Sequence, residues 1–262
     1  MASLDAGEGD QARYAVPALE RGLDILEYLA GEESGVTQSQ IAAKLELSPG
    51  SIFRTLICLE RRGYIYRKRP EDLYFLSLRL FELGHSFPPT KRLLDVAMPE
   101  MRALAAELGQ ACHLGVYSDG ELLIVADVES PRPINLAFRI GARWPMATTV
   151  SGRVLLAHQP SDVQAQWRAA MPDRAPEDFD DMLRLVAERG YDMKTEETFA
   201  GLTDIGAPIM GRFGALAALT VSFVRPSRGD IDFDDVLAKL RARAQRISAG
   251  LGGANGMWKG TK

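Results

Sequence analysis

The chain has 262 residues, of which 46% are hydrophobic and 25% charged, and its formal net charge is −4. This composition is typical of a globular protein, and the length suits two domains of unequal size. No apolar run reaches the length of a membrane span, and the acidic N-terminus is unlike a signal peptide. These features argue against a membrane protein, and we expect a cytoplasmic one.

Cysteine and histidine are rare in this sequence. Only Cys58 and Cys112 occur, which excludes a disulfide framework. His85, His113 and His158 are scattered without metal-ligand spacing, and each is interpreted as a structural or surface residue. We therefore expect no metal and no cofactor.

The N-terminal part predicts a helix followed by a helix-turn-helix. The first helix, over 18–30, has an apolar stripe made of Leu19, Leu23, Leu26 and Leu29. Thr37 and Gln40 form a capping box at the start of the second helix. The third helix begins with Ser48 as N-cap and Pro49 at its first position, and it ends at Gly63. Two short helices separated by so few residues are typical of a helix-turn-helix.

Residues 64–76 predict a basic hairpin. Two aromatic-rich runs flank a turn at residues 70–72, with Arg67, Lys68 and Arg69 at the tip. Between Ser48 and Arg69 there are six basic residues and one acidic residue, Glu60, although the whole chain is acidic. A basic hairpin after a recognition helix is typical of the wing of a winged helix, and local basicity indicates a polyanion as the partner.

Two amphipathic helices with a tight turn also occur in folds that never bind DNA, and the basic hairpin is what favours DNA binding here. A recognition helix reads base edges through its N-terminal residues, while basic and hydroxyl groups nearby hold phosphates. The predicted contacts with double-stranded DNA are Thr37, Gln38, Ser48, Pro49, Ser51, Phe53, Arg54, Thr55, Arg61, Arg67, Lys68 and Arg69.

The rest of the chain predicts a helical linker and an α+β domain. Residues 76–86 have helical spacing, the Pro88-Pro89 pair interrupts them, and a new helix is expected over about 91–108. Strands are expected at 113–118, 121–128, 133–138 and 215–224, with turns at Asp119-Gly120 and at 212–214. Helices are expected at 152–158, 163–170, 178–188 and 233–248. This pattern indicates an antiparallel sheet flanked by helices.

The expected domain organisation follows from these elements. We predict disordered tails at 1–13 and 252–262, a winged helix-turn-helix domain at 14–76, a helical linker at 77–90 and an α+β domain at 91–251.

Several segments resemble one known family. They are LERGLDILEYLA, TQSQIAAKLELSPGSIFRTLICLERRGYI and YFLSLRLFELG in the N-terminal half, and IGARWPMATTVSGRVLLA, RGYDMKTEETFAGLTDIGAPI and ALTVSF in the C-terminal half. Their order and spacing, from about residue 18 to 225, resemble the IclR (isocitrate lyase regulator) family of winged helix-turn-helix transcriptional regulators. The resemblance implies a GAF-like effector-binding domain at the C-terminus, dimerisation through the DNA-binding domains, frequent pairing into homotetramers, and partly palindromic operators.

The resemblance also implies an effector site. In the family, a small organic acid or aromatic metabolite enters a pocket between the sheet and the loops that carry these segments. Position by position, the effector-binding residues would be Val150, Ser151, Lys194, Asp204, Thr220 and Ser222. Their aromatic and apolar neighbours Trp144, Met146 and Leu202 are expected to line the same pocket. Lys194 stands where the family usually has Asp or Ser, Asp204 where it usually has Cys, Ser or Ala, and Ala147 where His is common. The two charged residues either pair with each other or contact the ligand.

The predicted function is a ligand-responsive transcriptional regulator of a catabolic operon, more often a repressor in this class. Ligand binding would shift the population of domain arrangements through the linker helix. One alternative is a DNA-binding protein whose C-terminal domain serves only oligomerisation, although polar residues at Asp204, Thr220 and Ser222 favour a sensor. A GAF-like enzyme is the remote alternative, because no nucleophile has a recognisable base, and no catalytic residue is predicted.

Overall fold

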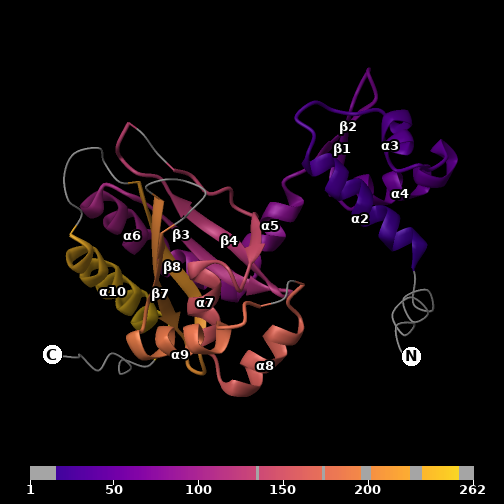
Figure 1. Cartoon of the computed structure of the whole chain (residues 1–262). Coiled ribbons are helices and arrows are strands. Elements are labelled where there is room, and N and C mark those ends of the chain that lie inside the picture. Colours follow the sequence, from indigo (N-terminus) through magenta and orange to yellow (C-terminus); the bar gives the residue numbers. More distant parts are fainter. Residues whose placement is uncertain (1–15, 134–135, 173–174, 196–201, 225–231, 254–262) are drawn as a thin grey trace, which may run out of the picture. The chain divides into compact units, whose positions relative to one another are not determined.

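The computed structural model describes residues 16–133, 136–172, 175–195, 202–224 and 232–253. The chain has two compact units, Met1–Thr90 and Lys91–Lys262 (Figure 1). Within the described ranges, no helix is long and apolar enough to cross a membrane.

The first unit is a small helical domain with a two-stranded sheet. Its elements are α2 (Pro17–Ala30), α3 (Gln38–Lys44), α4 (Pro49–Arg61), β1 (Ile65–Lys68), β2 (Leu73–Leu76) and α5 (Arg79–Ser86). Strands β1 and β2 are antiparallel, which confirms the predicted hairpin. The core joins the helices to the hairpin through Ile25, Ile41, Ile52, Leu56, Ile65 and Tyr74.

Local capping explains why α3 and α4 begin where the sequence predicts. The Gln40 side chain accepts a hydrogen bond from the Thr37 N–H (2.7 Å), and Thr37 Oγ1 accepts one from the Gln40 N–H (3.3 Å). Ser48 Oγ accepts from the Ser51 N–H at 3.3 Å, with Pro49 in the first turn. These bonds satisfy N–H groups that have no partner inside the helix. The helix-turn-helix prediction is confirmed.

The second unit combines a six-stranded sheet with helices. Its helices are α6 (Pro88–Leu108), α7 (Val150–Ala157), α8 (Ser161–Ala169), α9 (Phe179–Arg189) and α10 (Phe233–Gly250). Its strands are β3 (Ala111–Ser118), β4 (Glu121–Val128), β5 (Arg143–Pro145), β6 (Asp192–Thr195), β7 (Leu202–Met210) and β8 (Ala215–Val224). The sheet order is β5-β4-β3-β8-β7-β6, and each neighbouring pair is antiparallel. The predicted α+β class is confirmed.

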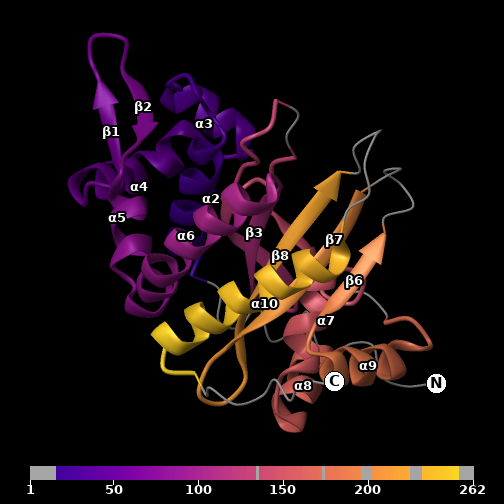
Figure 2. The ribbon, with the colours of Figure 1, turned by 90° about the vertical axis from the view of Figure 1, so that its left-hand side faces the viewer.

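Helices cover both faces of this sheet (Figures 1 and 2). Helices α6 and α10 pack on one face through a core that includes Met101, Leu219 and Leu240. Helices α7 and α9 pack on the opposite face through a second core that includes Val154 and Phe179. Side chains alternate along each strand, so every strand in the middle of the sheet contributes to both cores.

Three details of the predicted elements are wrong. Helix α6 begins at Pro88 rather than at about Lys91, because a missing N–H costs nothing in the first turn. The helix before the two prolines ends at Ser86, as predicted. Helix α5 begins at Arg79, since residues 73–76 pair as β2. The strand expected at 133–138 is absent at Pro133 and at 136–138, while 134–135 lie outside the described residues.

Strands β5 and β6 were not predicted, and β7 was expected only as the strand before the turn at 212–214, without bounds. Strand β7 contains Asp204, Gly206 and Pro208, which are residue types depleted in strands. All three belong to the face that α7 covers, so tertiary packing overrides their low strand propensity.

Candidate functional site

The solvent-exposed side of α4 carries most of the predicted DNA contacts. Ser48, Pro49, Phe53, Arg54 and Arg61 are exposed. On the opposite side of the helix, Ile52 and Leu56 are completely buried. The amphipathic pattern of α4 therefore directs its polar and basic residues to solvent.

Other predicted contacts have structural roles at the start of the same helix. Gln38 Nε2 donates to the Pro49 carbonyl at 2.8 Å, which ties the beginning of α3 to the beginning of α4. Arg21 from α2 donates to the Ser51 carbonyl at 3.2 Å. Thr37, Gln38, Ser51 and Thr55 are half-buried. These bonds orient α4 and leave its exposed face available.

The hairpin is basic, but its three cations differ. Lys68 and Arg69 are exposed. Arg67 is half-buried, lies 2.7 Å from Asp72 and stands over the Tyr74 ring at 5.6 Å. Hydrogen bonding to Arg67 holds the pKa of Asp72 below its usual value. Lys68 and Arg69 are therefore the stronger candidates for phosphate contact.

A second polar cluster lies in the other unit, on the sheet face beneath α7. The strand register places Asp127, His113, Thr220, Gly206 and Asp192 side by side across five strands. An adjacent row, two residues along each strand, contains Ala111, Ser222, Asp204 and Lys194. Residues that face one another across antiparallel strands point to the same side of the sheet. The sheet therefore presents two rows of side chains to α7.

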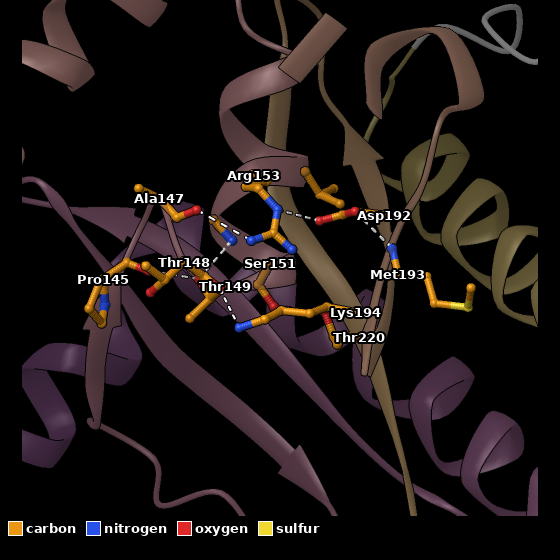
Figure 3. A network of polar contacts seen from close by, with 12 residues as sticks. Pro145, Ala147, Thr148, Thr149, Ser151, Arg153, Asp192, Met193, Lys194 and Thr220 are labelled. Carbon is orange, nitrogen blue, oxygen red and sulfur yellow. Dashed lines mark hydrogen bonds and ion pairs between the residues drawn. The ribbon is translucent and has the colours of Figure 1, made fainter. Parts of the chain in front are cut away.

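Helix α7 adds Ser151 to the first row (Figure 3). Ser151 Oγ lies 2.7 Å from Thr220 Oγ1 and 3.2 Å from His113 Nε2. All three residues are at most 4% exposed. Such close approach of α7 depends on Gly206, because a Cβ there would stand 2.7 Å from Val150 Cγ1 and 2.9 Å from Thr220 Oγ1.

An ion pair connects α7 to the edge strand β6. Arg153 Nε donates to Asp192 Oδ2 at 2.7 Å, and these side chains are only 7% and 14% exposed. The Arg153 guanidinium also donates to the Ala147 carbonyl at 3.3 Å (Figure 3). Arg153 therefore connects α7, β6 and the loop before α7.

The two unusual charged residues, Lys194 and Asp204, face each other in the second row. They are direct cross-strand partners between β6 and β7. Asp204 Oδ1 accepts a hydrogen bond from Ser222 at 2.6 Å, and Lys194 Nζ contacts the Thr148 carbonyl at 3.4 Å. Both charges therefore lie on the polar face, where opposite signs across a strand pair stabilise each other.

His113 and Asp127 belong to the first polar row, although neither was among the predicted site residues. Two buried atoms, His113 Nδ1 and Asp127 Oδ1, have no hydrogen-bond partner within the described part of the chain. Burial lowers the pKa of His113 to about 4, and burial raises the pKa of Asp127 to about 6. The available signal was a polar residue inside the apolar run of each of two strands, His113 in ACHLGV and Asp127 in LLIVADV.

The structure thus brings most of the predicted effector residues together. Val150, Ser151, Lys194, Asp204, Thr220 and Ser222 lie on the sheet face under α7 or on α7 itself. Met146 is buried beside α7, and Leu202 lies on β7 two residues before Asp204. Trp144 is on the edge strand β5 and is 45% exposed. Among the described residues, no group of three His, Cys, Asp or Glu side chains could hold a metal ion.

Comparison with known proteins decides the family. The model of the IclR helix-turn-helix domain matches residues 18–69, and that of the bacterial transcriptional regulator IclR C-terminal domain matches residues 90–249. The chain belongs to the IclR family. Its function as a DNA-binding transcriptional regulator follows from this membership and from its regulatory relatives.

Individual members of the IclR family extend the comparison. The chain is 31% identical over 247 residues to the glycerol operon regulatory protein of Streptomyces coelicolor, which covers 90% of this chain and 97% of that protein. It is 27% identical over 252 residues to the regulator KdgR of Escherichia coli, covering 93% and 95%. An IclR homologue from Microbacterium hydrocarbonoxydans, solved with 4-hydroxybenzoate, has the same fold with a TM-score of 0.73, 23% identity and coverage of 90% and 99%.

Proposed function

We propose that this IclR-family protein is a ligand-responsive repressor of a catabolic operon, and that its second unit binds a small organic acid or an aromatic metabolite. The observation that carries the proposal is the buried polar cluster beneath α7. Relatives support both parts. The chain is 25% identical over 250 residues to AllR of Escherichia coli, a transcriptional repressor, and the homologue from Microbacterium hydrocarbonoxydans contains 4-hydroxybenzoate.

The effector contacts of this proposal come from the two polar rows. Hydroxyl groups of Ser151, Thr220 and Ser222 supply donors and acceptors, and Lys194 is the cation of the rows. The carboxylate of a ligand complements the ammonium group of Lys194, which favours an organic acid as the ligand. His113 is a further candidate contact for the effector, because its Nε2 is hydrogen-bonded to Ser151 and its other ring nitrogen, Nδ1, is buried.

The first unit binds the operator in this proposal. Helix α4 enters the major groove, and Lys68 and Arg69 of the hairpin contact phosphates. A homodimer or homotetramer would match a partly palindromic operator, since the symmetry of the protein is repeated in its site. Effector binding would favour one arrangement of the second units, and the linker segment containing α5 would pass this preference to the recognition helices.

Two other functions are less well supported. A domain used only for oligomerisation has no need for Thr220 and Ser222, which are both 1% exposed, and apolar side chains would fill these places more favourably. For an enzyme, Ser151 of the polar rows lies 3.2 Å from His113 Nε2, but burial lowers the pKa of His113 to about 4, which makes its ring a weak general base at neutral pH. Cys112 precedes His113 in β3, and its side chain belongs to the core on the other face of the sheet. Burial raises the pKa of its thiol to about 12, which keeps it protonated and a poor nucleophile at neutral pH.

The test is a mobility shift of DNA from the protein's own upstream intergenic region, with and without a panel of aliphatic and aromatic acids. We expect a shift that one class of acid changes, and that remains but no longer responds in Lys194→Met. Lys239→Met is the matched control, because Lys239 is a lysine of α10 paired with Asp235. A shift that no compound changes would contradict ligand sensing, and the absence of any shift would contradict operator binding.

A further inference from the structure

Two large apolar side chains lie on the solvent-exposed side of the recognition helix α4. Phe53 and Ile57 are each 46% exposed. They stand four residues apart, so they are neighbours on one face of the helix. Neither belongs to the core of this unit, to which α4 contributes the fully buried Ile52 and Leu56. Both side chains are therefore accessible to a partner outside this unit.

The surroundings of Phe53 favour DNA as that partner. Arg54 and Arg61 are exposed on the same side of α4, and Lys68 and Arg69 are exposed on the hairpin. Toward the start of the helix, a Cβ added to Gly50 would have no heavy atom within 4 Å, so the backbone is open to a close approach. A polyanion complements these four basic residues. The same partner must also offer an apolar group to Phe53.

The major groove of DNA offers such a group. Thymine carries a C5-methyl group on its major-groove edge, and apolar side chains distinguish thymine through contact with it. The N-terminal half of a recognition helix meets the base edges, which places Phe53 closer to the bases than Ile57, one turn further along.

We propose that Phe53 reads a thymine in each half of the operator, by van der Waals contact between its ring and the C5-methyl group. The inference rests on the proposed function in one respect, namely that α4 is the helix that enters the major groove. It adds a specific base and a specific chemical group to that function. Cationic residues around Phe53 hold the duplex, whereas Phe53 makes binding depend on sequence.

Replacement of thymine by uracil tests the contact, because it removes only the methyl group. The full-length protein first selects duplexes from a random-sequence library, and thymines of the selected site are then replaced one position at a time. Fluorescence anisotropy at a fixed salt concentration gives each Kd. At one position per half-site we expect the uracil duplex to bind about three- to fivefold more weakly, as loss of one buried methyl group implies.

Protein variants complete the cycle. Phe53→Ala should bind the thymine and uracil duplexes equally at that position. Ile57→Ala is the matched control, since Ile57 is apolar, equally exposed and on the same helix face. It should keep the full preference for thymine. Circular dichroism should show both variants folded, because neither residue belongs to the buried core.

Four results would overturn the inference in distinguishable ways. If Phe53→Ala keeps the thymine preference of the original protein, another residue reads the methyl group. If no single uracil weakens binding although a sequence is selected, α4 binds DNA without a methyl contact. If the protein selects no sequence and binds no duplex, the proposed function fails and this inference fails with it. A change of oligomer mass in Phe53→Ala, with base preference intact, would assign Phe53 to a protein interface instead.

Discussion

The pair formed by His113 and Asp127 makes the stability of the second unit depend on pH in two opposite ways. Burial lowers the pKa of His113 from 6.5 to about 4, so the unfolded chain takes up this proton first as the pH falls. Acidification from pH 6.5 to 4 therefore destabilises the fold through His113. Burial raises the pKa of Asp127 from 3.8 to about 6, so here the folded state takes up the proton first. Acidification from pH 6 to 3.8 stabilises the fold through Asp127.

The magnitudes are comparable. The displacement at His113 corresponds to roughly 3 kcal/mol between pH 7 and 4. The displacement at Asp127 has a similar ceiling, but this side chain is partly exposed and solvent screening reduces its effect to roughly 1–2 kcal/mol. In the original protein the aspartate effect therefore offsets about half of the histidine effect between pH 6 and 4.

Single substitutions should separate the two effects. Asp127→Asn leaves only the histidine effect, so acidification should destabilise it more steeply than the original protein. His113→Gln leaves only the aspartate effect, so its stability should fall less or even rise. The difference between the unfolding free energies of the two variants should change by roughly 4 kcal/mol between pH 7 and 4. Other carboxylates contribute equally to both variants and disappear from this difference.

Urea unfolding followed by tryptophan fluorescence measures this difference directly. The three tryptophans are Trp144, Trp167 and Trp258, all in the second unit, so the signal excludes the DNA-binding unit. Stability curves of the two variants that run parallel from pH 7 to 4 would contradict the shifted pKa values of His113 and Asp127. A result in which Asp127→Asn is the less acid-sensitive variant would contradict them equally.

Three further predictions concern other contacts. Arg153→Met should destabilise the second unit by about 3 kcal/mol and lower its Tm by about 6–12 °C, because Asp192 stays buried without its partner. Adding Asp192→Asn should restore most of the lost stability, and a double variant without this recovery would contradict the ion pair. Arg54→Ala should weaken operator binding by about 1–3 kcal/mol in a mobility shift, selectively if it reads a base and uniformly if it contacts phosphate, whereas an unchanged shift would remove it from the interface. Lys68→Ala should reduce the slope of log K against log salt by about 1, and an identical slope would argue against a phosphate contact.

The elements of the first unit could be predicted because their signals are local. Thr37 and Gln40 lie three residues apart and satisfy each other's backbone groups, and Ser48 with Pro49 determines where α4 begins. Such signals need no knowledge of the rest of the fold. The same holds for the turn at Asp119-Gly120, where both residues have positive φ and join β3 to β4.

The candidate effector site could be predicted only in part, because its geometry is tertiary. From the sequence alone, Gly206 argues against a strand. In the structure, its missing side chain leaves room for Val150 of α7 and for Thr220 of β8. His113 reads as an isolated histidine until the register puts it between Thr220 and Asp127 and the helix brings Ser151 to its ring. Because a strand pattern reveals which residues share a face but not what covers that face, buried polar residues in apolar strands are the signal to follow. In this chain, the polar residues His113 and Asp127 of β3 and β4 lie on the same sheet face as Thr220 and Asp204, which the family resemblance had indicated separately.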